Sequence, residues 1–208
     1  DILFRNVFNQ EYNVSFSGGS DRAHYYASAG YYTEQGTVKG VENDRFNVTL
    51  KSDFKINRML TVGASVFANQ RKQKSYMTDT GGFTNPVYYS RMANPYFEPF
   101  DAMGNYIYDT NVQGRESEAP DFNIFEERNN TSKNRKDRSM MAIFDATLKF
   151  NSHLKLTSQY GLQHDNYTLK RYAGHNSHAM RKAKEYATFM VDGERKSNLP
   201  DGSMIKQP

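Results

Sequence analysis

The sequence predicts an all-β fold built from antiparallel, up-and-down strands of the kind that cross a membrane in a β-barrel. Three observations predict it: several segments alternate between apolar and polar residues, the apolar rows are long, and short turns alternate with long loops. The composition agrees, because a mean hydropathy of -0.85 coexists with 15 tyrosines and 14 phenylalanines among 208 residues. Strands that face lipid on one side and water on the other are polar on average.

The composition and the motifs exclude several classes of protein. The chain has no cysteine, so it has no disulfide framework and no thiolate ligand or nucleophile. Its 27 basic and 23 acidic residues are mixed and give a net charge of +4, unlike the concentrated basic surface of a nucleic-acid binder. The sequence has no run of about 18 apolar residues, the length that a transmembrane helix needs. Phosphate-binding loops, nucleophile elbows and zincin motifs are also missing, so we expect no enzyme, cofactor, metal site or nucleic-acid partner.

The first two strands are expected near residues 10–17 and 23–33. In the first, apolar residues alternate with polar ones at Tyr12, Val14 and Phe16. In the second, one face carries Tyr25, Ala27, Ala29 and Tyr31, and a short turn between the strands is indicated by Gly18-Gly19-Ser20-Asp21. The tyrosines fit either the aromatic girdle of a barrel or packing inside its lumen.

The third strand, near residues 45–57, has the clearest pattern. One row is apolar except for Ser52 and contains Phe46, Val48, Leu50, Phe54 and Ile56. The other row is polar and includes Arg45, Lys51, Asp53 and Lys55. The apolar row is about 33 Å long at ~3.3 Å per residue, and a tilt of ~40° reduces this to ~25 Å, the height of a lipid-facing band. We expect the apolar row to face lipid and the polar row to face the lumen.

Three further strands are expected near 60–70, 139–150 and 154–169, although Phe67 breaks the alternation of the first of them. Short turns are predicted at 57–59 and 151–153, whereas the longer connections are 34–44, 71–138 and 170–208. Short and long connections alternate, so a meander places all the short turns at one end of the sheet. In outer-membrane barrels the short turns are periplasmic and the long loops are external.

The loop 71–138 is rich in aromatic residues, which stack well on sugar rings. Its candidates for contact with a substrate or partner are Tyr88, Tyr89, Tyr96, Phe97, Tyr106 and Tyr108. Hydrogen bonds to hydroxyl groups could come from Asn85, Asn94, Asp101 and Asn105. The alternative is that the aromatic side chains pack the loop against itself. Basic clusters near 128–138 and 170–184 could meet lipid phosphates or an acidic partner, or could simply be solvated.

Alternation alone also fits a soluble β-sandwich, which would be an aromatic-rich domain that binds glycans at the cell surface. Strand length and the asymmetry of the loops favour the membrane barrel, because strands of soluble proteins usually have ~5–6 residues. A third possibility is a barrel that has a structural role and transports nothing.

Several segments resemble the barrel strands of SusC/RagA-like TonB-dependent transporters. They span about residues 5–170, and their order and spacing are specific: Ser17-Gly18-Gly19-Ser20, Tyr25-Tyr26-Ala27-Ser28-Ala29-Gly30-Tyr31, Glu34-Gln35-Gly36-Thr37-Val38-Lys39, Arg45-Phe46-Asn47-Val48-Thr49-Leu50, Leu60-Thr61-Val62-Gly63, Phe144-Asp145-Ala146-Thr147-Leu148-Lys149-Phe150, Leu154-Lys155-Leu156-Thr157-Ser158 and Tyr160-Gly161. The resemblance implies a plugged barrel of about 22 strands in the bacterial outer membrane.

The same resemblance implies a function and partners. Such transporters import oligosaccharides, glycans or peptides, take energy from the TonB complex and are capped by a SusD-like lipoprotein. The chain shows no signal sequence, plug domain or TonB-contacting segment, so we expect residues 1–208 to be a partial barrel domain of a larger protein.

Overall fold

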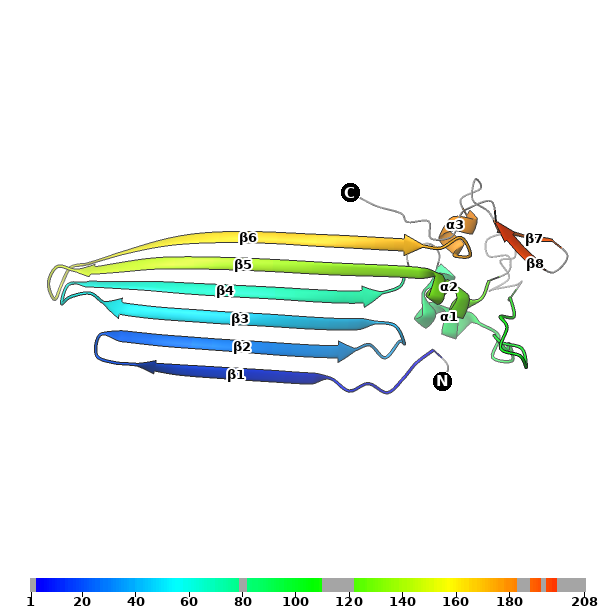
Figure 1. Ribbon diagram of the computed structural model, residues 1–208, viewed down its shortest axis with the longest axis horizontal. Helices are drawn as coiled ribbons and strands as arrows, with labels where there is room; N and C mark the ends of the chain where they lie inside the picture. The colour runs from blue at the N-terminus through cyan, green and yellow to red at the C-terminus, as the bar shows by residue number, and fades with distance from the viewer. Residues whose placement is uncertain (1–2, 79–81, 110–121, 183–187, 192–193, 198–208) are drawn as a thin grey trace.

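A computed structural model describes residues 3–78, 82–109, 122–182, 188–191 and 194–197, with side chains described up to residue 180. One antiparallel sheet dominates it, and its strand order follows the chain (Figure 1). Its strands are β1 (Gln10–Gly19), β2 (Ala23–Gln35), β3 (Glu42–Lys55), β4 (Leu60–Ser75), β5 (Thr131–Lys149) and β6 (Lys155–Ala173). A separate hairpin is formed by β7 (Thr188–Val191) and β8 (Glu194–Ser197).

The predicted all-β meander is confirmed, because each of the six strands pairs with its neighbour in sequence. The sandwich alternative is wrong for the part of the chain that the structure describes. A sandwich needs a second sheet packed ~10 Å away over the apolar face. Apart from the β7–β8 hairpin, the described strands all belong to one sheet.

The strands extend further towards the long connections than the alternation predicts. β4 continues to Ser75 and β5 starts at Thr131, so the connection between them is 76–130, and the connection between β2 and β3 is only 36–41. The added residues are polar, which hides them from a search for apolar alternation. Their backbones still pair, for example Lys72 with Lys136, and this pairing satisfies the N–H and C=O groups without an apolar row.

The three short turns all lie at one end of the sheet, as the alternation of short and long connections predicts (Figure 1). Two of them use the same device, in which an asparagine oxygen accepts two backbone N–H groups. The Oδ1 atom of Asn57 lies 2.8 Å from the nitrogens of both Met59 and Leu60. Asn151 repeats this arrangement before β6.

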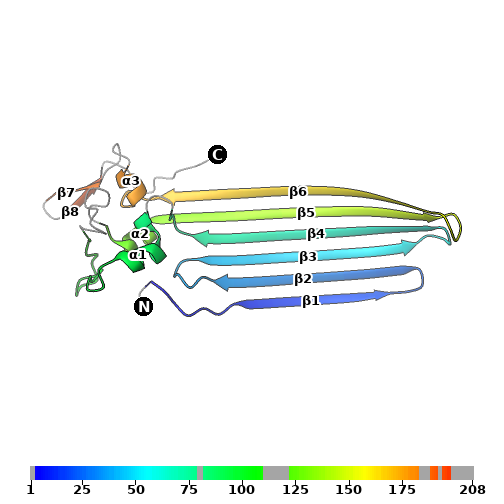
Figure 2. The ribbon, with the colours of Figure 1, turned by 180° about the vertical axis from the view of Figure 1, so that it is seen from behind.

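A small helical cap lies at the opposite end and is formed by the connection 76–130 and the residues that follow β6 (Figure 2). It contains a 3-10 turn, η1 (Gly82–Thr84), and the helices α1 (Pro86–Met92), α2 (Ile124–Asn130) and α3 (His178–Lys182). Its apolar core consists of Phe83, Tyr89, Phe122, Ile124 and Phe125. The core of the described chain therefore lies in the cap and not against the sheet. None of the described helices is long and apolar enough to cross a membrane.

One amide holds three segments of the cap together. The side chain of Asn123 is fully buried, and its Nδ2 atom donates to the carbonyl oxygens of Pro99 at 2.8 Å and Ile107 at 2.7 Å. Its Oδ1 atom accepts from the backbone nitrogens of Phe125 at 2.9 Å and Glu126 at 3.2 Å, which caps α2. These four bonds connect the loop around 99–107 to the helix that leads into β5.

Candidate functional site

One face of the six-stranded sheet is apolar from edge to edge. The register aligns the predicted lipid-facing row of β3 with apolar rows on the other strands, so that Leu50 lies beside Ala27 on one side and Val66 on the other. The large side chains of this face are exposed, including Val14 at 66%, Leu50 at 48% and Leu162 at 51%. The four tyrosines considered for an aromatic girdle also lie on this face: Tyr12, Tyr25, Tyr31 and Tyr160.

The boundary of the apolar face slopes across the sheet. On β3 the apolar row begins at Phe46, whereas on β6 it ends at Leu162, which is in register with Leu50. The boundary thus moves by four residues over three strand steps. Strands tilted by ~40° and spaced ~4.8 Å apart should shift by ~4 Å, or ~1.2 residues, per step to stay level in a membrane. The observed slope agrees with the tilt of a barrel strand.

The opposite face is polar, and it carries the four predicted lumen-facing residues of β3. Arg45 lies 3.9 Å from the carboxylate of Glu11, and its guanidinium is 5.4 Å from the ring centre of Tyr32. Lys51, Asp53 and Lys55 follow along the strand on the same face. Nearer the cap, Asn43 of the same face accepts a hydrogen bond from Arg71 at 2.8 Å and donates one to Glu34 at 3.3 Å, and such polar side chains suit contact with water.

Phe67, which interrupts the alternation of β4, belongs to this polar face. The ammonium nitrogen of Lys51 lies 5.4 Å from the centre of its ring, a cation–π contact. In β5 the neighbour of Phe67 in the register is Met141, so a small apolar area sits within the polar face. An apolar side chain on the polar face is tolerated where other side chains contact it, so β4 does not have to alternate strictly.

Three of the six aromatic candidates of the long loop are used inside the cap. Tyr89 is 4% exposed and packs in the apolar core, and burial raises the pKa of its hydroxyl well above the usual value. Tyr106 packs against that core, and its hydroxyl accepts a hydrogen bond of 2.8 Å from Asn129. The hydroxyl of Tyr108 lies 3.3 Å from a carboxylate oxygen of Glu126. Self-packing therefore accounts for the positions of these three side chains.

The other three candidates are more accessible. Tyr96 is 91% exposed and Tyr88 is 41% exposed. Phe97 is half-buried and borders an apolar hollow of about 200 Å³, which is also lined by Leu3 and Ala93. Tyr88 lies within α1, and Tyr96 and Phe97 follow this helix, so the three aromatic side chains belong to one stretch of the cap.

The polar residues considered for hydrogen bonds to hydroxyl groups act mainly within turns. Asn85 caps α1, and Asn94 accepts from the nitrogen of Tyr96 at 3.0 Å. Asp101 accepts from the side chain and backbone of Asn105, each at 2.8 Å, and these hydrogen bonds lower the pKa of its carboxyl group. The loop is thus an ordered unit that presents a few aromatic side chains.

Two features were missed by the sequence analysis. The first is the role of Asn123, although a signal existed: an asparagine followed three residues later by Glu126 is a helix-start pattern. The second is a groove on the apolar side of the sheet, where the register of strands distant in sequence brings parts of the two predicted basic clusters beside Lys72 and Lys74. Among the described residues, no group of acidic, histidine or cysteine side chains could hold a metal ion.

Comparison with known proteins relates this sheet to outer-membrane receptors. No family model matches the chain. It is 31% identical over 107 residues to TonB-dependent receptor P39 of Formosa agariphila, which covers 51% of this chain and 10% of that relative. It is 34% identical over 71 residues to TonB-dependent receptor P3 of the same organism, with 33% of this chain and 7% of that relative covered.

Two solved structures share the fold. One, of the RagAB peptide transporter, has a TM-score of 0.63 at 24% identity and covers 81% of this chain and 19% of that chain. The other, of the RagAB peptide importer in the 'closed-closed' state, has a TM-score of 0.62 at 23% identity, with 85% and 20% covered. The chain resembles part of the barrel of a SusC/RagA-like TonB-dependent transporter.

The similarity to TonB-dependent receptors confirms two of the predictions. The six strands have the fold of a barrel segment, and the predicted location in the bacterial outer membrane is confirmed. The chain spans between 7% and 20% of the lengths of the TonB-dependent receptors and RagAB chains that it matches. The chain is similar to the two receptors in sequence and to the RagAB structures in fold.

Proposed function

We propose that this chain forms part of the barrel wall of a TonB-dependent importer in the outer membrane. The observation that carries the proposal is the exposed apolar face, which is continuous over six strands and opposed by a polar face. The largest apolar patch of a soluble monomer usually measures ~300–600 Å². A face that is apolar across six strands of 10 to 19 residues needs a covering, and a bilayer supplies one.

In this proposal the two faces of the sheet meet different surroundings. The apolar row of β3 that contains Phe46, Val48, Leu50 and Phe54 contacts lipid, and so does Ile56, which follows the last residue of the strand. The charged residues of the opposite row line a hydrated lumen, and these are Arg45, Lys51, Asp53 and Lys55. The slope of the apolar boundary supports this arrangement, because it keeps the band level in the membrane when the strands tilt.

The cargo is an oligomeric nutrient, a glycan or a peptide, and import takes energy from the TonB complex. A SusD-like surface lipoprotein acts as the lid of the barrel. The similarity to TonB-dependent receptors supports the energy source, and the likeness in fold to a peptide transporter supports import of a polymer fragment. The helical cap lies at the end of the sheet where external loops are expected, so it is suitably placed to meet a lid.

Deletion and complementation of the full-length receptor test this function. Uptake of labelled oligosaccharides and of labelled peptides is measured in cells with and without the receptor, and again with the TonB complex uncoupled by a protonophore. We expect uptake of one cargo class to require both the receptor and the energised membrane. Uptake that is unchanged by deletion for every cargo would favour a structural barrel and refute the proposal.

Within the cap, we assign contact with cargo or lid to Tyr88, Tyr96 and Phe97, whose rings are the most accessible of the candidates. The test replaces Tyr96 with alanine in the full-length receptor. A group that stacks on such a ring contributes about 1–3 kcal/mol to binding. We therefore expect the affinity for cargo or lid to fall roughly 5- to 100-fold. Tyr96→Phe keeps the ring face and should retain most of the affinity.

Met103 provides a matched control for Tyr96. It is 85% exposed in the same loop, but it has no aromatic face. Met103→Ala should leave affinity unchanged. Equal losses for Met103→Ala and Tyr96→Ala would indicate a general disturbance of the loop, and no loss for Tyr96→Ala would remove this side chain from the contact surface.

A further inference from the structure

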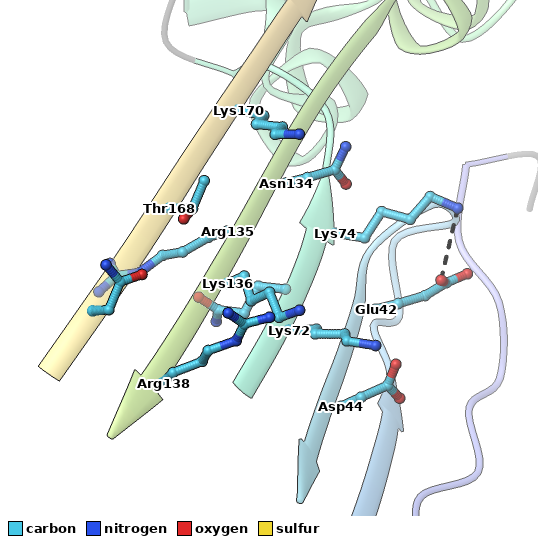
Figure 3. A pocket seen from close by; sticks show the side chains of 12 residues that line it. Glu42, Asp44, Lys72, Lys74, Asn134, Arg135, Lys136, Arg138, Thr168 and Lys170 are labelled. Carbon is cyan, nitrogen blue, oxygen red and sulfur yellow. Dashed lines mark ion pairs between the residues drawn. The ribbon is translucent and has the colours of Figure 1, made fainter. Parts of the chain in front are cut away.

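A basic groove of about 500 Å³ lies across β3 to β6 near the cap (Figure 3). Its cations come from three neighbouring strands, β4, β5 and β6. They are Lys72, Lys74, Lys136, Arg138 and Lys170, together with Arg135, which forms an ion pair with Asp137 at 2.8 Å. Two acidic residues, Glu42 and Asp44, lie at its β3 side. Without Arg135, whose charge is matched by Asp137, the other five cations exceed the two carboxylates by three charges.

The register places this groove on the same face of the sheet as the apolar band. Arg138 lies in the row of Phe46, and Lys72 and Lys136 share the next row towards the cap. All of them therefore point to the side of Leu50 and not to the polar face that carries Lys51. In a barrel, this side is the outer wall, so the groove lies immediately beyond the edge of the lipid-facing band.

Several cations of the groove lie next to other cations and not next to carboxylates. Lys72 stands directly opposite Lys136, and like charges in facing positions destabilise a sheet. Figure 3 shows Arg138 beside this pair, and its Nε atom is 3.3 Å from the side-chain oxygen of Gln70. Within the described residues, no ion pair joins Lys72, Lys136 or Arg138 to a carboxylate.

The two nearby carboxylates have other partners. Glu42 forms an ion pair with Lys74 at 3.8 Å. Asp44 faces Lys72 across the strands, but its Oδ1 atom accepts hydrogen bonds from Thr33 at 2.8 Å and Tyr31 at 3.4 Å. Among the described residues, Asp44 is therefore the one carboxylate of the groove that faces Lys72, and the β4–β5 part of the groove keeps an excess of positive charge.

The position of the groove relative to a bilayer indicates which anion it binds. The groove is at the end of the strands that carries the long connections, which is the external end of an outer-membrane barrel. It begins where the apolar band ends, at the depth of the lipid headgroups. Lysine presents a point charge and arginine a planar fork, and both bind phosphate well.

We propose that this basic groove binds the phosphate groups of lipids in the outer leaflet, a proposal that rests on the proposed function because the apolar face must lie in the bilayer. The phosphate lies among Lys72, Lys136 and Arg138, where it relieves the repulsion between the facing lysines. The acyl chains of the same lipid then cover the apolar band directly below. The lipid headgroup thereby fixes the height of the barrel wall in the membrane.

The test compares two sets of charge-removing variants in the full-length receptor. The groove set combines Lys72→Gln, Lys136→Gln and Arg138→Gln, and the control set combines Arg45→Gln, Lys51→Gln and Lys55→Gln on the opposite face. Binding is measured to vesicles that contain purified lipopolysaccharide, and to vesicles with the same lipid after enzymatic removal of its phosphates. Each cation near an anionic lipid surface changes the affinity by a factor of about five. Because the groove set removes three cations, it should bind roughly 100-fold more weakly.

The control set should bind as the unmodified receptor does, and removal of the lipid phosphates should abolish the difference between the two sets. Equal binding by the groove set and the unmodified receptor would overturn the proposal, and so would displacement of the lipid by millimolar inorganic phosphate, which would indicate a site for free anions.

Outer-membrane fractionation and cargo uptake are measured in parallel. A receptor that fractionates and imports normally but shows no phosphate-dependent binding overturns this proposal alone, whereas failure to fractionate with the outer membrane overturns the proposed function.

Discussion

Placing an arginine in the apolar face measures directly what that face contacts. Leu50 lies four residues from Phe46 and six from Ile56, which are the two ends of the apolar row; Phe46 lies in β3, and Ile56 directly follows it. These steps correspond to ~13 Å and ~20 Å along the strand, or ~10 Å and ~15 Å along the membrane normal at a tilt of ~40°. Leu50 is therefore close to the middle of a band ~25 Å high. An arginine there should cost about 2–4 kcal/mol in a membrane.

The measurement uses the full-length receptor folded into lipid vesicles and unfolded reversibly with denaturant. The free energy of unfolding of Leu50→Arg is compared with that of Leu50→Ala, which removes the same contacts without adding a charge. The same pair of substitutions at Phe46 should differ by only about 0–1 kcal/mol, because Phe46 lies at the edge of the band. At Thr49, on the polar face, arginine and alanine should differ little.

The order of these three differences decides the question. If Leu50, at 48% exposure, faced water, the arginine would change stability by no more than about 0.5 kcal/mol. A larger cost at Thr49 than at Leu50 would mean that the assignment of the two faces is reversed. Either result would refute the placement of the apolar row in lipid.

Two more predictions concern the cap. Asn123→Leu removes four hydrogen bonds and leaves the carbonyls of Pro99 and Ile107 buried without their donor, so we expect a local loss of about 3–5 kcal/mol, seen as faster hydrogen exchange in α2 but not in the sheet. The matched variant Asn85→Leu removes only an exposed cap and should cost about 1 kcal/mol; equal effects would contradict the assigned role of Asn123. Burial raises the pKa of Tyr76 to about 12, so its contribution to stability is fully present below pH 10 and is lost as the pH rises through about 12. Tyr76→Phe should remove one phenol from the high-pH end of the ultraviolet titration, and loss of a phenol near pH 10 instead would show that Tyr76 is solvated.

The strands and their faces were predictable because alternation is a local property. Residues such as Phe46 and Leu50 point to one side of the sheet whatever the neighbouring strand is, so the sequence alone separates them from Arg45 and Lys51. The ends of β4 and β5 were not predictable in this way. Beyond residue 70 both strands become polar on both faces, and only their pairing with each other shows that they continue to Ser75 and back from Thr131.

The candidate aromatic residues show the same division. Their concentration in one loop is visible in the sequence, but their separation into buried and exposed rings depends on the core of the cap. Tyr88 and Tyr89 are adjacent in the chain, yet one is exposed and the other is packed against Phe122. A short helix turns neighbouring side chains by about 100°, so a single residue step decides which of them is buried.

The sequence by itself determined the class of fold, the two faces of each strand and the resemblance to TonB-dependent transporters, since all three follow from short-range patterns in the chain. The tertiary structure alone decided the register, and with it the slope of the apolar band and the meeting of Lys72 with Lys136 across the 55-residue connection 76–130. Register depends on the backbone hydrogen bonds between strands, and a shift of one residue would move every side chain to the other face. No pattern within a single strand contains that information.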